Sequence, residues 1–401
     1  MKSKYAILLG LIIPALFFNA ACKSQKPNLK PKTELIRVID DNLQDAARQY
    51  KVLAKLTPAD RLPRFFQNGK LITSDSKWWC SGFYPGTLLY LYEATGDDTL
   101  YVEALKKLKL LEKEQYNKNT HDLGFMMFDS FGNANRIMPK PEYENILINS
   151  ARSLSTRFSE STGVIRSWNS TPNSFKVIVD NMMNLELLFW ATRVTHDSSF
   201  YKIAVTHANT TIKNHFRPDN SSYHLVDYNP QTGIPQKKQT VQGYADSSAW
   251  ARGQVWGLYG YSVMYRETKD QKYLEQANKI AQFIITHPNF PSNGILYWDF
   301  NAPEIPDALR DASAAAILAS ALIELAGYNN GEMAKKYLNT AETILQTLSA
   351  PAYKAEDGEN GGFLLKHSVG HLPGKSEVDV PLTYTDYYFV EAMLRYKNLK
   401  K

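Results

Sequence analysis

The chain has 401 residues, of which 44% are hydrophobic and 21% charged, so it can bury a large core and is not intrinsically disordered. Its formal net charge is +6, but Lys and Arg alternate with Asp and Glu instead of forming runs, which argues against a nucleic-acid partner. Aromatic residues reach 12%, and aromatic faces pack against sugar rings, so the composition leans weakly towards a carbohydrate ligand.

The N-terminus is typical of an export signal. Lys2 and Lys4 precede an apolar run over residues 6–18, which is shorter than the ~20 residues that a bilayer-spanning helix needs. Small residues then lead to Cys22, in a pattern that resembles a bacterial lipoprotein signal, where the cysteine becomes the lipidated first residue. Asn19 stands where such signals usually carry an apolar residue, so secretion without lipid stays an alternative.

This interpretation divides the chain and places it in the cell. We expect the periplasm or cell envelope as its location, with the lipid as its only membrane attachment. The polar, proline-containing segment after Cys22 suits a tether. The predicted parts are a signal peptide over 1–21, the lipidated cysteine and tether over 22–34, and one catalytic domain over 35–401.

Helical periodicity recurs through the rest of the chain, and two kinds of segment alternate. Segments such as 101–116 are charged and amphipathic, whereas 311–326 is apolar on nearly all sides, which is typical of a buried helix. Six such alternations predict an all-α (α/α)6 toroid, a barrel of six inner helices ringed by six outer ones; an α-solenoid is the alternative, but no strict period appears. The predicted helices cover 35–55, 83–96, 98–118, 123–132, 141–158, 180–196, 198–218, 247–267, 270–288, 311–328, 330–349 and 382–399.

The longer connections are rich in Pro, Gly, Asn and aromatic residues, and in a toroid they would gather on one face and wall a pocket. A β-hairpin is expected within 222–243, around a turn that contains Pro230 and Gly233. The long connections are 57–82, 160–179, 219–246, 289–310 and 350–381.

Two aspartates stand where a loop enters a predicted inner helix. Asp180 follows the apolar run 177–179, and Asp122 precedes Leu123 and Gly124. Each could be a helix N-cap, which would lower its pKa and suit a structural role. Two such carboxylates beside aromatic and apolar residues instead favour an acid–base site, because paired carboxylates in an apolar pocket resist double ionisation.

Several segments, in order along the chain, resemble those of the unsaturated glucuronyl hydrolase family, glycoside hydrolases that act on the products of polysaccharide lyases. The resemblance covers about residues 35–400, and the fold of that family is the (α/α)6 barrel. The segments are WCSGFYPG (79–86), HDLGF (121–125), DNMMN (180–184), QGYAD (242–246), WARGQVW (250–256), EVDV (377–380) and DYYF (386–389).

The resemblance implies an activity and a site. Such an enzyme releases a terminal 4,5-unsaturated glucuronic acid from an oligosaccharide, here expected to derive from a glycosaminoglycan, by hydrating the C4=C5 vinyl ether. Asp180 would be the general acid/base and Asp122 the second essential carboxylate. The residues implied around the unsaturated sugar are His224, Gln242, Arg252 and Trp256, with Trp79 and Phe83 on its faces and Trp168 beside them.

Structural roles remain open for several of these residues. The planar fork of Arg252 suits a uronate carboxylate, but a buried ion pair with Asp246 is the alternative. His224 and the tryptophans could be core residues. Cys80 is expected to be a small buried residue rather than a nucleophile.

The sequence carries no metal-ligand spacing and no phosphate-binding glycine loop, so we predict no metal, no cofactor and no obligate protein partner. Three other functions stay open: an unsaturated rhamnogalacturonyl hydrolase acting on pectin fragments, an ordinary inverting glycosidase, and a non-catalytic sugar-binding lipoprotein.

Overall fold

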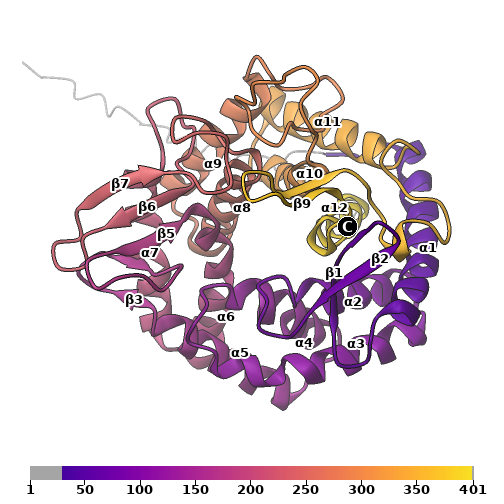
Figure 1. Ribbon diagram of the computed structural model, residues 1–401, viewed down its shortest axis with the longest axis horizontal. Coiled ribbons are helices and arrows are strands. Elements are labelled where there is room, and N and C mark those ends of the chain that lie inside the picture. Colours follow the sequence, from indigo (N-terminus) through magenta and orange to yellow (C-terminus); the bar gives the residue numbers. More distant parts are fainter. Residues whose placement is uncertain (1–28, 400–401) are drawn as a thin grey trace, which may run out of the picture.

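Two concentric rings of helices make up the computed structural model, which describes residues 29–399; the predicted signal peptide and Cys22 lie outside them. Figure 1 shows the chain passing round the ring until α12 meets α1 and α2, so the predicted (α/α)6 barrel is confirmed and a solenoid is excluded. The outer helices are α1 (Thr33–Leu56), α3 (Asp98–Leu111), α5 (Pro141–Ser155), α7 (Ser198–His215), α9 (Gln271–Thr286) and α11 (Gly331–Leu348).

The inner helices differ from ideal α-helices at two places. A π-helix over Gly124–Gly132 continues as α4 (Asn133–Ile137), and a 3₁₀ turn over Val179–Asn184 continues as α6 (Leu185–Thr195). The other inner helices are α2 (Phe83–Thr95), α8 (Ala251–Thr268), α10 (Ala312–Ala326) and α12 (Thr383–Asn398). In α10 every residue except Glu324 is buried, as expected for an inner helix. Within residues 29–399, no helix combines the length and the apolar character needed to cross a bilayer.

Short and long connections alternate because each inner helix leads into the next outer helix by a tight turn. Gly96, His196 and Lys269 adopt a left-handed conformation that ends α2, α6 and α8. The aspartate after each of them, Asp97, Asp197 or Asp270, caps the following outer helix by accepting a backbone N–H bond. All inner helices therefore begin at one face of the barrel and end at the other.

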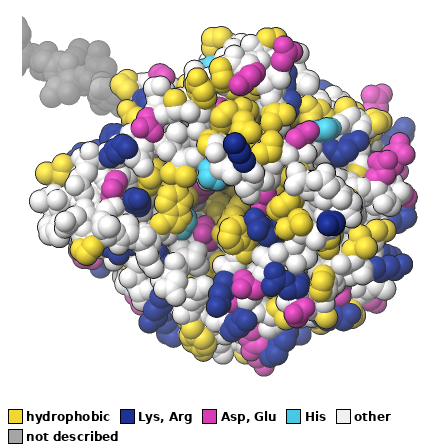
Figure 2. Space-filling model, in the orientation of Figure 1, with side chains coloured by type: hydrophobic (Ala, Val, Ile, Leu, Met, Phe, Trp, Pro, Cys, Tyr) yellow, Lys and Arg dark blue, Asp and Glu magenta, His cyan; other side chains and the backbone are white. Residues whose placement is uncertain are grey.

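The long connections enter the inner helices, and most of them carry β-hairpins on that first face (Figure 1), whereas the connection over 289–310 forms only isolated bridges. The hairpin predicted within 222–243 is confirmed as β6 (Leu225–Tyr228) and β7 (Pro235–Gln239), but β5 (Phe175–Ile178) also pairs with β6. The remaining hairpins are β1 (Leu62–Gln67) with β2 (Lys70–Ser74), β3 (Phe158–Ser159) with β4 (Val164–Ile165), and β8 (Ser368–His371) with β9 (Ser376–Val380). Figure 2 shows this face hollowed near its centre, with hydrophobic, histidine and acidic side chains visible in the hollow.

Four aromatic rings close the barrel axis beneath this hollow, and we call them the aromatic plug. Phe83 and Phe125 lie 5.4 Å apart, Phe125 and Trp256 5.1 Å, Trp256 and Tyr388 5.2 Å, and Tyr388 and Phe83 5.8 Å between centroids. Each ring is at most 2% exposed. The plug separates the N-terminal ends of the inner helices from their C-terminal ends.

We expect Gly82→Ala to destabilise the protein strongly, because a Cβ at Gly82 would lie 2.2 Å from the Phe125 carbonyl oxygen and 2.3 Å from that of Met126. Overpacking of this kind costs about 1–3 kcal/mol or more. Thermal unfolding measures it, with Gly327→Ala as the control, since a Cβ there meets only the Glu324 carbonyl oxygen at 3.2 Å. Equal melting temperatures for the two variants would contradict the contact between α2 and the π-helix.

Candidate active site

Asp180 lies where β5 leads into the 3₁₀ turn before α6, at the face of the barrel where the inner helices begin. Its side chain does not cap the turn, so the N-cap alternative is wrong. The carboxyl is buried, and among the described residues its Oδ2 has no hydrogen-bond partner. Burial raises the pKa of Asp180 to about 7, although the charge of Arg252 opposes the shift; the charge of Asp122 adds to it.

His224 faces this carboxyl from the hairpin side, with its Nε2 3.7 Å from Asp180 Oδ2. Its Nδ1 accepts hydrogen bonds from the backbone N–H groups of Val241 at 3.1 Å and Gln242 at 3.3 Å. A neutral imidazole that accepts at Nδ1 carries its proton on Nε2, so the N–H points towards Asp180. Burial and the nearby Arg252 lower the pKa of His224 to about 3, and the ring is therefore neutral near pH 7.

Asp122 lies at the start of the π-helix, and its side chain does not cap that helix either. Its Oδ2 accepts a bond from Thr120 Oγ1 at 2.9 Å, and its Oδ1 lies 3.2 Å from His121 Nε2. His121 Nδ1 contacts the Ser167 carbonyl oxygen at 3.0 Å, which places a proton on Nδ1. Among the described residues His121 Nε2 has no hydrogen-bond partner, and burial lowers the pKa of His121, so its neutral ring and Asp122 lie side by side without a bond.

Arg252 is held by the protein itself. It forms an ion pair with Asp311 at 2.9 Å, not with Asp246 as the alternative had it. Its Nη1 also donates to the Val369 carbonyl oxygen and its Nη2 to that of Gly370, both at 2.5 Å, which ties β8 to α8. The guanidinium is 1% exposed, so its first effect is to place a fixed positive charge near Asp180.

The predicted sugar-facing aromatic residues fall into two groups. Phe83 and Trp256 are 0% and 1% exposed and belong to the aromatic plug, so the core interpretation holds for these two. Trp79 and Trp168 are partly exposed; Trp79 lies 4.9 Å from Tyr384, and Trp168 lies edge-on to His224 at 6.2 Å. Gln242 is partly exposed as well and donates to the Gly370 carbonyl oxygen at 3.0 Å.

Sequence reasoning missed the residues that support this site. Trp250 packs 4.7 Å from His224 and 4.6 Å from the Arg252 guanidinium, and Tyr384 lies 5.3 Å from the same guanidinium. Asp311 carries the ion pair with Arg252, and His121 lies beside Asp122. Trp250 and His121 belong to two of the segments that resemble the family, so their position next to predicted site residues could have identified them. Asp311 and Tyr384 gave no such signal, since neither stands inside a quoted segment.

Other chemistry is not evident around the hollow. Within residues 29–399, no group of three or more His, Cys, Asp and Glu side chains is arranged to hold a metal ion. Cys80 is buried with a free thiol whose pKa burial raises, as expected for a small core residue.

Comparison with known proteins agrees with this arrangement. Residues 59–398 match the family model described as Glycosyl Hydrolase Family 88. A protein of Formosa agariphila named unsaturated glucuronyl hydrolase is 43% identical over 98% of both chains, and one of Bacillus sp. with the same name is 31% identical over 90% of this chain and 96% of its own. A solved structure described as an unsaturated glucuronyl hydrolase specific for heparin is 44% identical, with a TM-score of 0.88, covering 91% of this chain and 98% of the other.

We expect Asp180→Asn to raise the melting temperature more at pH 8 than at pH 5. The folded pKa of about 7 lies above the unfolded value of about 4, so the stability linked to this proton is complete below pH ~4 and is lost as the pH rises to about 7. Above that pH the folded protein holds a buried charge, and the amide does not. Differential scanning calorimetry of both proteins at the two pH values measures the effect.

Asp386→Asn is the matched control. The pKa of Asp386 is also raised to about 7 by burial, but this carboxyl accepts bonds from the Leu364 and Leu365 N–H groups and from Tyr50. Its amide variant should lose stability at both pH values. A shift in Asp180→Asn that is the same at pH 5 and pH 8 would contradict a raised pKa at Asp180.

Proposed function

The chain belongs to Glycosyl Hydrolase Family 88 and is an unsaturated glucuronyl hydrolase, and from this premise we propose that Asp180 is the acid that protonates the substrate. The enzyme acts on glycosaminoglycan-derived oligosaccharides that end in a 4,5-unsaturated uronic acid. The observation that carries the proposal is a buried carboxyl with a pKa of about 7 and an unbonded Oδ2 that faces His224.

The proposed reaction adds water across the C4=C5 bond. The Asp180 carboxyl gives its proton to C4, which leaves an oxocarbenium-like cation at C5. Water attacks C5 and gives a proton back to the Asp180 carboxylate. The hemiketal formed at C5 then opens, and the former glycosidic bond breaks to release a keto-sugar and the shortened oligosaccharide. Proton transfer by a placed acid contributes roughly 10²–10⁴-fold to the rate.

The neighbours of Asp180 suit this cycle. Before the reaction, burial raises the pKa of the carboxyl to about 7, so a large share of the enzyme carries the proton near neutral pH. After the proton has left, the Nε2–H of His224 faces the new carboxylate, and the fixed charge of Arg252 also stabilises it. Asp122 with His121 supplies a second carboxylate that can orient the attacking water.

We further propose roles for the remaining predicted residues. Trp79 and Trp168 are partly exposed and would pack against the sugar ring. Gln242 lies beside the β8 hairpin and would bind hydroxyl groups of the sugar. Arg252 attracts the uronate carboxylate chiefly by its charge, because Asp311 and two carbonyl oxygens already occupy it. Phe83 and Trp256 support the site from below as part of the plug.

Heparin-derived disaccharides are the substrates we propose to test first. The support is the solved structure described as specific for heparin, which is 44% identical to this chain. A pectin-derived substrate is the weaker candidate, since the curated relatives carry the glucuronyl hydrolase name. An ordinary inverting glycosidase would cleave saturated and unsaturated substrates alike, whereas protonation at C4 requires the double bond.

Asp180→Asn should lose at least about a hundredfold in kcat, in line with removal of a general acid. The ultraviolet absorbance of the conjugated double bond in unsaturated heparin disaccharides follows the reaction. Asp41→Asn, a change of an exposed aspartate on α1, is the matched control and should keep full activity. Reaction of the wild type in heavy water should leave deuterium on C4 of the product, and saturated disaccharides should be inert. Full turnover by Asp180→Asn, or product without deuterium, would refute the mechanism.

We also propose that Cys22 is lipidated and anchors the enzyme in the periplasm or cell envelope. The basic residues, short apolar run and small residues before Cys22 support the proposal. The full-length protein from bacterial membranes should partition into the detergent phase of Triton X-114, and Cys22→Ser should move it to the aqueous phase. Cys80→Ser, at the other cysteine of the chain, should not. Aqueous partitioning of the wild type would refute lipidation.

A further inference from the structure

A second cavity of about 510 Å³ lies on the far side of the aromatic plug from Asp180. Its walls come from the next turns of the helices that carry the plug: Asp129 follows Phe125 by four residues, Tyr259 follows Trp256 by three, and Glu391 follows Tyr388 by three. The volume is that of a small-molecule site, which commonly measures about 300–1,000 Å³. None of the residues assigned to the reaction above lines this cavity.

The arginines that line the cavity already have acidic partners. At the partly exposed rim, Arg136 makes two bonds to Glu93, at 2.8 and 2.7 Å. Arg193 pairs with Glu267. Deeper inside, Arg395 pairs with Glu324 at 2.6 Å. The arginines that line the cavity are therefore paired with protein carboxylates, so the cavity has little attraction for an anion.

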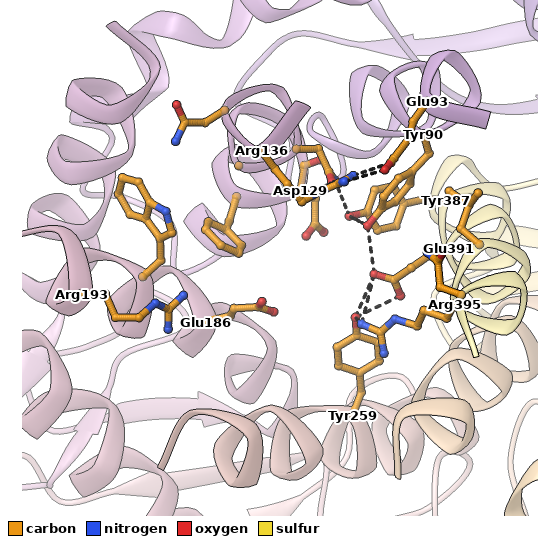
Figure 3. A pocket seen from close by; sticks show the side chains of 17 residues that line it. Tyr90, Glu93, Asp129, Arg136, Glu186, Arg193, Tyr259, Tyr387, Glu391 and Arg395 are labelled. Carbon is orange, nitrogen blue, oxygen red and sulfur yellow. Dashed lines mark hydrogen bonds and ion pairs between the residues drawn. The ribbon is translucent and has the colours of Figure 1, made fainter. Parts of the chain in front are cut away.

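The two acids beside Arg395 are likewise held. Glu391 lies 3.4 Å from Arg395 and accepts bonds from Tyr259 and from Ser320. Glu186 forms an ion pair with Arg266. Both carboxylates nevertheless point into the open space of the cavity, together with Asp129, as Figure 3 shows.

Asp129 is the exception among the acids of the cavity. In the described part of the chain it takes part in no ion pair, and its buried Oδ2 has no hydrogen-bond partner. Burial, with the charges of Glu391 and Glu186, raises the pKa of Asp129 well above its usual value; Tyr387 and Arg395 oppose the shift. The carboxyl thus lines the cavity without a positive partner of its own among the described residues.

We propose that this cavity is a binding site for a small organic ammonium ion, whose charge pairs with Asp129 and whose apolar body packs on the aromatic walls. Phe128, Trp190 and Tyr259 supply those walls, and aromatic faces attract cations. The C-terminal ends of α2, α6 and α12 also face the cavity, and helix C-termini carry partial negative charge. This site goes beyond the proposed function and does not depend on it.

Isothermal titration of the full protein at pH 7.5 with benzylamine and benzyl alcohol tests the proposal, because the two probes share size and ring but only the first is a cation. We expect benzylamine to bind at least about tenfold more tightly.

Asp129→Asn should weaken benzylamine binding at least about tenfold and leave hydrolase activity unchanged, whereas the surface control Asp41→Asn should change neither. Asp180→Asn should lose hydrolysis and keep benzylamine binding, which separates this site from the active site. If Asp129→Asn does not fold, Trp190→Ala provides the test and should weaken both probes. Equal affinity for the two probes, no binding at millimolar concentration, or binding indifferent to both cavity variants would overturn the proposal.

Discussion

The removal of one carboxyl group from water is the constraint on which the active site depends. Asp180 is the second residue of the 3₁₀ turn that follows β5, so its side chain does not receive the backbone bonds that an N-cap would give it. Those bonds would have lowered its pKa, whereas burial without them raises it. Asp386 is a useful comparison, because burial raises its pKa as well. Its two oxygens, however, already accept hydrogen bonds from the Leu364 and Leu365 N–H groups and from Tyr50, so neither is free to act on a ligand.

The fold supplies this environment through the asymmetry of its connections. Turns such as Gly96–Asp97 return each inner helix to the outer ring almost at once, so the long segments all lie at the opposite face. There β5 and β6 bring Asp180 and His224 together although 44 positions separate them in the chain. The inner helices also direct their N-termini to that face, and the partial positive charge of helix N-termini favours an anionic substrate.

The helical part of this arrangement could be predicted from the sequence, because apolar periodicity reports which helices are buried. The same periodicity could not distinguish an α-helix from the π-helix over Gly124–Gly132, since the two differ in hydrogen bonding and not in composition. Sequence alone suggests ion-pair partners among residues that are close in the chain, and Asp246 was therefore the alternative partner for Arg252. The actual partner, Asp311, lies 59 positions away and is brought near by the packing of α10 against α8.

Burial alone does not decide what an isolated carboxyl can do; its charged neighbours do. Burial raises the pKa of Asp180 to about 7, and the fixed charge of Arg252 limits that rise. Burial also raises the pKa of Asp129, on the other side of the aromatic plug, and there the charges of Glu391 and Glu186 add to the rise while Tyr387 and Arg395 oppose it. The two carboxyls therefore differ in the charges that act most strongly on them: a guanidinium on Asp180 and two carboxylates on Asp129. The aromatic plug lies between these two environments in one barrel, with Arg252 acting on Asp180 and Glu391 and Glu186 acting on Asp129.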